Sequence, residues 1–211
     1  MDENALGQQR ITEVFKILSG DVTELHYLRN TYTFLFTSDH FAELFTRTAP
    51  AFFTDIYMML FEGMALSASR LLDWARSSRS SGSRDNCSLA QLLSLIEKTG
   101  ENQSLWLRLT SELEEVRANN PLKFFRDRRY GHRDLEFALG KLSEQSGVDL
   151  GDLDRLLDGI DGIMNAVAEA CGCNADTFFG LIPAVGAQQI VARLQVNEST
   201  PVPAPGRAAE G

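Results

Sequence analysis

The sequence predicts an all-α fold, arranged as one helical domain over residues 1–197 with a disordered tail over residues 198–211. Apolar residues recur at steps of three and four along almost the whole chain, which is the spacing of one face of a helix. No segment of convincing length alternates apolar and polar residues as a half-buried strand would. The tail is polar, rich in proline and glycine, and contributes no core residue.

Three helices are expected before residue 50. Gly20 is expected to end the first, because glycine is a poor helix former. Asp21 and Glu24 then favour a new helix start, since each side chain can pair with a free amide of the first turn. Ser38 can cap the short third helix. The residues expected to face inward are Ile11, Val14, Phe15 and Leu18; Leu25, Leu28, Tyr32, Leu35 and Phe36; and Phe41, Leu44 and Phe45.

The longest helix is expected to begin at Pro50 and to run to about Trp74. Proline suits the first helical position, where its missing amide costs no hydrogen bond. Residues 77–86 are rich in serine, glycine and arginine without an apolar period, which predicts a mobile connection. Its arginines could help to hold RNA, although loose charges are more often simply hydrated; they are Arg76, Arg79 and Arg84. The broad apolar face of the long helix, typical of a core element, comprises Phe52, Phe53, Ile56, Met59, Leu60, Met64, Ala68, Leu71 and Leu72.

The second half of the chain is also predicted to be helical, from the same spacing of apolar residues. Ser88 with Gln91 predicts a capped helix start. The pair Asn120-Pro121 breaks the next helix and can begin another. Asp149 begins a long amphipathic helix that is expected to stop at Gly172. The apolar faces expected here are Leu89, Leu92, Leu93 and Ile96; Leu105, Leu109, Leu113 and Val116; Leu135, Leu139 and Leu142; Leu153, Leu156, Leu157, Ile160, Met164 and Val167; and finally Phe178, Phe179, Leu181, Ile182, Ile190, Val191 and Leu194.

Composition limits the possible functions. The net charge of −9 disfavours broad adhesion to nucleic acid or to an anionic membrane, so any such contact needs a local basic patch. Three cysteines argue against a disulfide framework and for a reducing compartment, and Cys171 and Cys173 lack zinc-ligand spacing. The N-terminal residues contain no apolar signal core, and no stretch is apolar enough to span a membrane. We therefore expect a cytoplasmic protein without a metal or cofactor.

One short segment carries most of the chemistry of this sequence. Residues 126–133, RDRRYGHR, place four arginines beside one of only three histidines. Histidine can move a proton near neutral pH, and a guanidinium can hold a phosphate through two parallel hydrogen bonds. Together these groups are sufficient for metal-free attack of an RNA 2′-hydroxyl on its neighbouring phosphate. The alternative is a structural one: cations suit the end of a helix, and Asp127 and Asp134 can pair with them in an ordinary ion-pair network.

The segment resembles the Arg-polar-x₄-His signature of the HEPN superfamily. Five residues separate Arg126 from His132, and Asp127 takes the polar position. The continuation His132-Arg133-Asp134 resembles the ending common in the abortive-infection U-type branch, with glycine in place of the usual alanine before the histidine. A second block, residues 69–73 (SRLLD) followed by a loop and NCSL at 86–89, is similar to the middle region of the same branch.

This resemblance implies an up-and-down helical bundle with additional helices, commonly a homodimer whose paired motifs form a composite cleft. Many HEPN proteins are metal-independent endoribonucleases in phage defence or toxin–antitoxin pairs, so RNA is the expected substrate and an antitoxin or nucleotidyltransferase a possible partner. The alternative is a non-catalytic module that binds a protein or nucleotide. By analogy the catalytic residues are Arg126 for the phosphate, Asp127 for orientation and His132 for acid–base work, with Arg128, Arg129 and Arg133 as substrate-binding residues.

Overall fold

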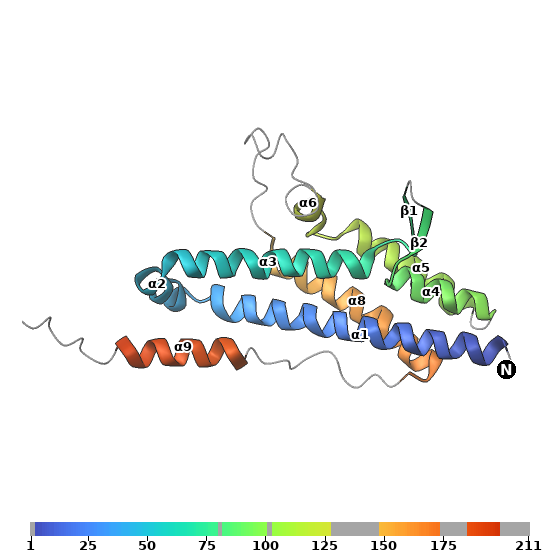
Figure 1. Ribbon diagram of the computed structural model, residues 1–211, viewed down its shortest axis with the longest axis horizontal. Helices are drawn as coiled ribbons and strands as arrows, with labels where there is room; N and C mark the ends of the chain where they lie inside the picture. Colours follow the sequence, from blue (N-terminus) through green and yellow to red (C-terminus); the bar gives the residue numbers. More distant parts are fainter. Residues whose placement is uncertain (1–2, 80–81, 101–102, 128–147, 174–184, 199–211) are drawn as a thin grey trace, which may run out of the picture.

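The computed structural model describes residues 3–79, 82–100, 103–127, 148–173 and 185–198. Helices make up nearly all of this part of the chain, which confirms the all-α prediction (Figure 1). The expected helical stretches over residues 135–142 and 178–182, and residues 199–211 of the expected tail, lie outside the described residues. The helices are α1 (Glu3–Phe36), α2 (Asp39–Thr48), α3 (Pro50–Leu72), α4 (Leu89–Thr99), α5 (Gln103–Ala118), α6 (Lys123–Phe125), α8 (Leu150–Cys171) and α9 (Val185–Glu198).

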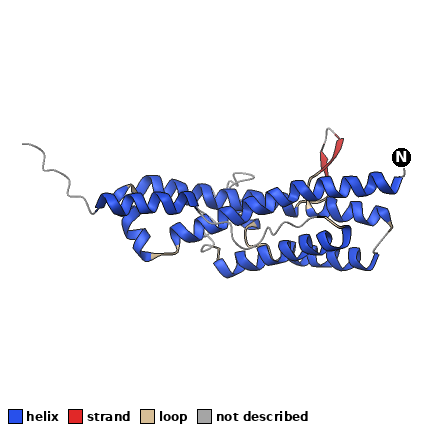
Figure 2. Ribbon diagram, turned by 90° about the horizontal axis from the view of Figure 1, so that it is seen from below, coloured by secondary structure: helices blue, strands red, loops and turns tan. Residues whose placement is uncertain are grey.

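The long helix α1 is the centre of the bundle. It runs alongside α3 and also contacts α4 and α8, while α5 packs between α4 and α8 (Figure 1). The short α6 lies against α3, and the whole assembly of helices is elongated (Figure 2). In the described part of the chain, no helix combines the length and the apolar character that crossing a membrane would require.

The core consists of two clusters. The larger one lies among α1, α3, α4, α5 and α8, and its members include Leu18, Leu25, Met64, Leu92 and Ile160, all with no exposed surface. The smaller cluster lies where α2 joins α1 and α3, takes Ala187 and Val191 from α9, and includes several aromatic rings. There the Phe45 and Phe53 rings stack with centroids 3.8 Å apart. Burial of these side chains at roughly 1.5–3 kcal/mol each drives the bundle together.

The prediction that Gly20 ends a helix is wrong, because α1 continues through it for its full length. A glycine inside a helix costs about 1 kcal/mol relative to alanine. Leu18, Val22 and Leu25, on both sides of the glycine, are completely buried in the main cluster. Their burial outweighs the cost of the glycine, so Asp21 and Glu24 lie within the helix rather than at its start.

Most other predicted helix starts are confirmed. The Ser88 side chain accepts a hydrogen bond from the Gln91 amide at 3.3 Å, and Asp149 accepts one from Gly151 at 2.6 Å. Helix α3 starts at Pro50 as expected. Ser38 occupies the cap position of α2, but its side chain makes no capping hydrogen bond. At the other end of α8, Gly172 adopts the left-handed φ of 62°, which glycine tolerates best.

Two predictions about the long helix α3 need correction. The helix ends at Leu72, two residues before the expected end. Phe52 and Met59, which the apolar pattern placed in the core, are 55% and 65% exposed. They lie seven residues apart on the outer face of a helix whose opposite face already fills the bundle.

The expected connection over residues 77–86 is instead a short hairpin. Strand β1 (Arg76–Arg79) pairs antiparallel with β2 (Gly82–Asp85), with Arg76 opposite Asp85. Arg76 Nε donates to Asp85 Oδ1 at 3.1 Å, and Asn86 Nδ2 donates to the carbonyl of Trp74 at 2.7 Å. The first contact joins the two strands, and the second ties the residue after β2 to the segment that follows α3. The sequence carried no apolar alternation that could have predicted the hairpin.

Candidate functional site

The beginning of the arginine–histidine segment lies at the end of α6. Arg126 caps this short helix, and its backbone amide donates to the Leu122 carbonyl at 3.0 Å. Asp127 follows directly. The other four predicted site residues lie outside the described part of the chain; they are Arg128, Arg129, His132 and Arg133. The site is therefore built here from Arg126 and what surrounds it.

Two carboxylates orient the guanidinium of Arg126. Its Nη1 donates to Asp73 Oδ1 at 3.4 Å, and its Nε donates to Asp127 Oδ1 at 2.5 Å. The Arg126 side chain remains about one-third exposed, at 34%. Partly exposed ion pairs of this kind contribute only about 0–1 kcal/mol to stability, so their effect is mainly to fix direction. The result is an oriented cation that solvent, and hence a ligand, can still reach.

Asp73 is itself held in place by an arginine of α5. Arg117 donates from Nε to the Leu72 carbonyl and from Nη2 to the Asp73 carbonyl, both at 2.7 Å. These carbonyls belong to the end of α3, where helix groups lack partners within the helix and partial negative charge accumulates. The third nitrogen, Nη1, donates to Glu114 Oε1 at 2.6 Å. Arg117 thus joins α5 to the end of α3 and fixes the backbone from which Asp73 reaches Arg126.

These residues surround a pocket of about 290 Å³, which we call the basic pocket. Its charged and aromatic lining consists of Asp73, Trp74, Glu114, Arg117, Lys123 and Arg126. Three cations and two carboxylates line the pocket, and Asp127, which pairs with Arg126, is a third carboxylate beside it. Within the described residues, no carboxylate forms an ion pair with Lys123. Cations are gathered here on an acidic protein, and Lys123 is the one most available to an anionic ligand.

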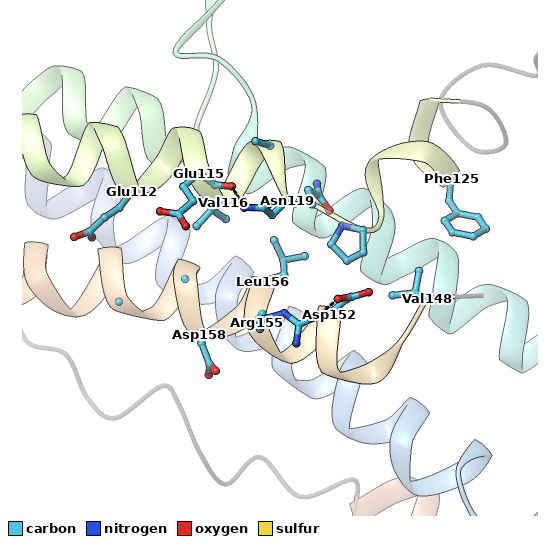
Figure 3. Close-up of a pocket in the computed structure, with 15 residues that line it drawn as sticks. Glu112, Glu115, Val116, Asn119, Phe125, Val148, Asp152, Arg155, Leu156 and Asp158 are labelled. Carbon is cyan, nitrogen blue, oxygen red and sulfur yellow. Dashed lines mark hydrogen bonds and ion pairs between the residues drawn. The ribbon is translucent and has the colours of Figure 1, made fainter. Parts of the chain in front are cut away.

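A larger pocket of about 910 Å³ lies between α5 and α8 (Figure 3). We call it the acidic pocket, because its charged lining is Glu112, Glu115, Asp152, Asp158 and the single cation Arg155. Arg155 already pairs with Asp152. Four carboxylates against one arginine repel a polyanion, so the larger pocket is the less suitable one for RNA.

The two glycines of α8, Gly159 and Gly162, differ in their surroundings. A side chain at Gly159 would place its first carbon 2.5 Å from Val116 Cγ2, so this glycine is what lets α5 and α8 approach closely. At Gly162 the same carbon would meet nothing within 4 Å. Close packing at Gly159 brings α5, and with it Arg117, to its place in the bundle.

The remaining histidines and cysteines have structural surroundings. Among the described residues, no three His, Cys, Asp or Glu side chains gather as metal ligands would. His26 Nε2 lies 3.0 Å from both carboxylate oxygens of Asp161, which links α1 to α8. Cys171 and Cys173 are half-buried, and burial raises the pKa of the Cys173 thiol. A raised pKa keeps a thiol protonated and poorly nucleophilic near neutral pH.

Sequence reasoning missed most of the supporting residues of the basic pocket. Asp73 fell within a block that resembled the family, but nothing in the sequence assigned it a role. Arg117 lies 44 residues from Asp73 and belongs to an ordinary amphipathic helix, so no local pattern marked it. Trp74 was expected to be the end of a core helix, and Lys123 carried no signal beyond its proximity to the motif.

The comparison with protein families identifies one family. The model of the AbiU2 HEPN family matches residues 13–177, a range that contains both sequence blocks and the whole basic pocket. No curated protein and no solved structure matches the chain significantly. The family match covers well over half of the sequence and confirms the resemblance drawn from the two blocks. The chain belongs to the AbiU2 family of HEPN proteins.

Proposed function

We propose that this protein binds RNA at the basic pocket and cleaves it there without a metal ion. The observation that supports this most directly is the meeting of the two sequence blocks. Asp73, from the first block, holds Arg126, from the second, although 53 residues separate them. Ser69 and Leu72 of the first block line the same pocket. A shared cation-bearing pocket is the arrangement expected if both blocks serve one site.

In the proposed reaction, a neutral His132 imidazole removes the proton from an RNA 2′-hydroxyl. The resulting oxygen attacks the neighbouring phosphorus, and the bond from phosphorus to the 5′-oxygen breaks. The products are a 2′,3′-cyclic phosphate and a 5′-hydroxyl end, with the proton passed on to the leaving oxygen. Arg126 stabilises the negative charge that develops on the phosphoryl oxygens, and Asp127 orients Arg126. Arg128, Arg129 and Arg133 contribute substrate binding.

The biological setting is proposed by analogy with the family. The protein would act as a homodimer whose two motifs face one cleft, in phage defence or as the toxin of a toxin–antitoxin pair in the cytoplasm. An antitoxin or a nucleotidyltransferase would then be its partner. A dimer would place two sets of arginines and a second proton-transfer group near one RNA.

The test is cleavage of labelled RNA at low salt in the presence of EDTA. Arg126→Ala is expected to reduce the rate by about 10²–10³-fold, and His132→Ala by about 10²–10⁴-fold. Arg108→Ala is the matched control, because Arg108 is an exposed arginine of α5 outside the basic pocket that pairs with Glu112 in the same helix. Equal cleavage by all four proteins, or none by the parent, would remove the catalytic assignment.

A second candidate function is a non-catalytic helical module, and the acidic pocket is the observation that favours it. Its volume and its four carboxylates suit a basic protein segment better than RNA. This function predicts that His132→Ala leaves partner binding and the cellular phenotype unchanged. Glu115→Gln with Asp158→Gln would instead weaken partner binding, as measured by calorimetry with the isolated partner.

A further inference from the structure

Trp74 is a large aromatic residue whose side chain is mostly exposed. It follows directly after the end of α3, lines the basic pocket and is 65% exposed. The guanidinium carbon of Arg117 lies 4.3 Å from the centroid of its ring, in a cation–π contact. Since Arg117 covers one face of the indole and most of the side chain is exposed, the opposite face is open to solvent.

The ring is also held in a fixed position. Arg117 is anchored to the backbone just before the tryptophan, at the carbonyls of Leu72 and Asp73. Asn86, the residue after strand β2, donates a hydrogen bond to the backbone carbonyl of Trp74 itself. A flat aromatic surface that is already ordered costs little conformational entropy when a ligand stacks on it. Trp74 therefore has the properties of a prepared stacking platform.

The neighbours of Trp74 indicate what would stack there. Lys123 and Arg126 line the same pocket and offer cations to a phosphate. An aromatic face beside such cations is the combination by which proteins bind single-stranded nucleic acid, the base on the ring and the backbone on the cations. Bases inside a duplex are stacked on one another and cannot present a free face to a side chain. The volume of about 290 Å³ suits one small ligand unit, such as one nucleotide.

We propose that Trp74 stacks against the base of a single-stranded RNA nucleotide whose phosphate lies at Arg126 and Lys123. The substrate class of the site is then unpaired RNA, with little preference for base identity, because every base has a stacking face. This proposal rests on the proposed function for RNA as the ligand. It adds a binding residue, Trp74, that belongs to neither the arginine–histidine segment nor the block over residues 69–73.

The test measures binding of two probes in a His132→Ala background, which prevents cleavage. The probes are a short oligoriboadenylate and an abasic oligomer of the same length and charge. Trp74→Ala is expected to weaken binding of the oligoriboadenylate by about 5- to 150-fold and to leave the abasic oligomer nearly unaffected. Trp74→Phe keeps an aromatic face and should restore part of the loss. A purely structural role of Trp74 would weaken both probes equally, which would overturn the proposal.

Fluorescence gives an independent reading of the same contact. The chain has two tryptophans, and Trp106 is partly buried against the main core. In a Trp106→Phe variant all tryptophan emission comes from Trp74, and the oligoriboadenylate should quench it while the abasic oligomer should not. Equal quenching by both probes, or none by either, counts against stacking.

The two proposals can fail separately. Cleavage that depends on Arg126 and His132 but not on Trp74 leaves the nuclease function in place and overturns the stacking contact. Stacking at Trp74 without any cleavage by the parent protein removes the catalytic assignment and leaves a single-strand binding site. Failure of the parent to bind either probe overturns the stacking proposal as well.

Discussion

The contact between Gly159 of α8 and Val116 of α5 gives a direct test of the structure. We expect Gly159→Ala to destabilise the protein relative to a matched change in the same helix. The new carbon would lie 2.5 Å from Val116 Cγ2, whereas carbon atoms pack best about 3.5–4.0 Å apart. One of the two helices, or the valine, must therefore move by about 1 Å.

The valine cannot easily make room. A β-branched side chain on a helix has one strongly preferred rotamer, so turning the methyl group away is itself costly. Overpacking of this kind typically costs about 1–3 kcal/mol. Alanine also gains about 1 kcal/mol over glycine in helix propensity, which hides part of that cost in the single variant.

Gly162→Ala is the control that separates the gain in helix propensity from the cost of the steric clash. It lies in the same helix and its new carbon would meet nothing within 4 Å, so it gains the propensity without the clash. In urea unfolding we expect Gly162→Ala to exceed Gly159→Ala in unfolding free energy by about 1–3 kcal/mol. When Val116→Ala is added to both glycine variants, the methyl group that clashes with residue 159 is gone. Most of the difference in unfolding free energy between the two variants should then disappear, because the two sites are coupled. Equal stability of the two glycine variants would refute the close approach of α5 and α8.

Three further outcomes follow from named contacts. Asp73→Asn weakens the hold on Arg126, and misplacement of that cation is expected to slow RNA cleavage by up to about a hundredfold in the EDTA assay. Ser88→Ala removes the cap of α4 and should cost about 0.5–2 kcal/mol in urea unfolding. Burial and the hydrogen bond with Tyr57 raise the pKa of Tyr32 well above its ordinary value. The unfolded chain then loses this proton first, so unfolding free energy should fall as pH rises above about 10, and fall less in Tyr32→Phe.

Features settled by near neighbours in the chain could be predicted from the sequence. The cap at Ser88 involves an amide three residues away, and the cap at Asp149 one only two residues away. Pro50 needs no partner at all to favour the first turn of a helix. In each case the hydrogen bonds or sterics that decide the structure lie within one turn, so sequence spacing already contains them.

Features settled by tertiary packing could not be predicted in this way. The glycine at position 20 reads as a helix end, and only the burial of Leu18 and Val22 against other helices explains why α1 continues. The hairpin over residues 76–85 is held by a contact between its strands and by a hydrogen bond from Asn86 to Trp74, just after α3, with no apolar pattern of its own. Neither the burial against other helices nor the polar contacts of the hairpin follow from a local spacing pattern, so the sequence alone does not predict them.

The residues of the candidate site also fall into those that a local pattern could predict and those that depend on tertiary packing. The sequence identified Arg126 by its position in a motif, because a motif is a local pattern. It could not identify Arg117, whose hydrogen bonds cross from α5 to the end of α3. A residue that fixes another through the backbone leaves no spacing signature, since any position on the facing helix could supply it.

The proposed RNA ligand has to be reconciled with the overall acidity of the chain, and most of the carboxylates near α5 line the acidic pocket rather than the basic one. Glu112 and Glu115 line the acidic pocket, whereas Arg117 lines the basic one. Fields of exposed charges decay over about 10 Å at 0.1 M salt, so a phosphate at Arg126 responds mainly to the nearest groups. A pocket with few cations contacts few phosphates, and its affinity has to come partly from an uncharged contact. The stacking contact proposed for Trp74 would supply such a contact, and would let a small basic pocket bind RNA on an acidic protein.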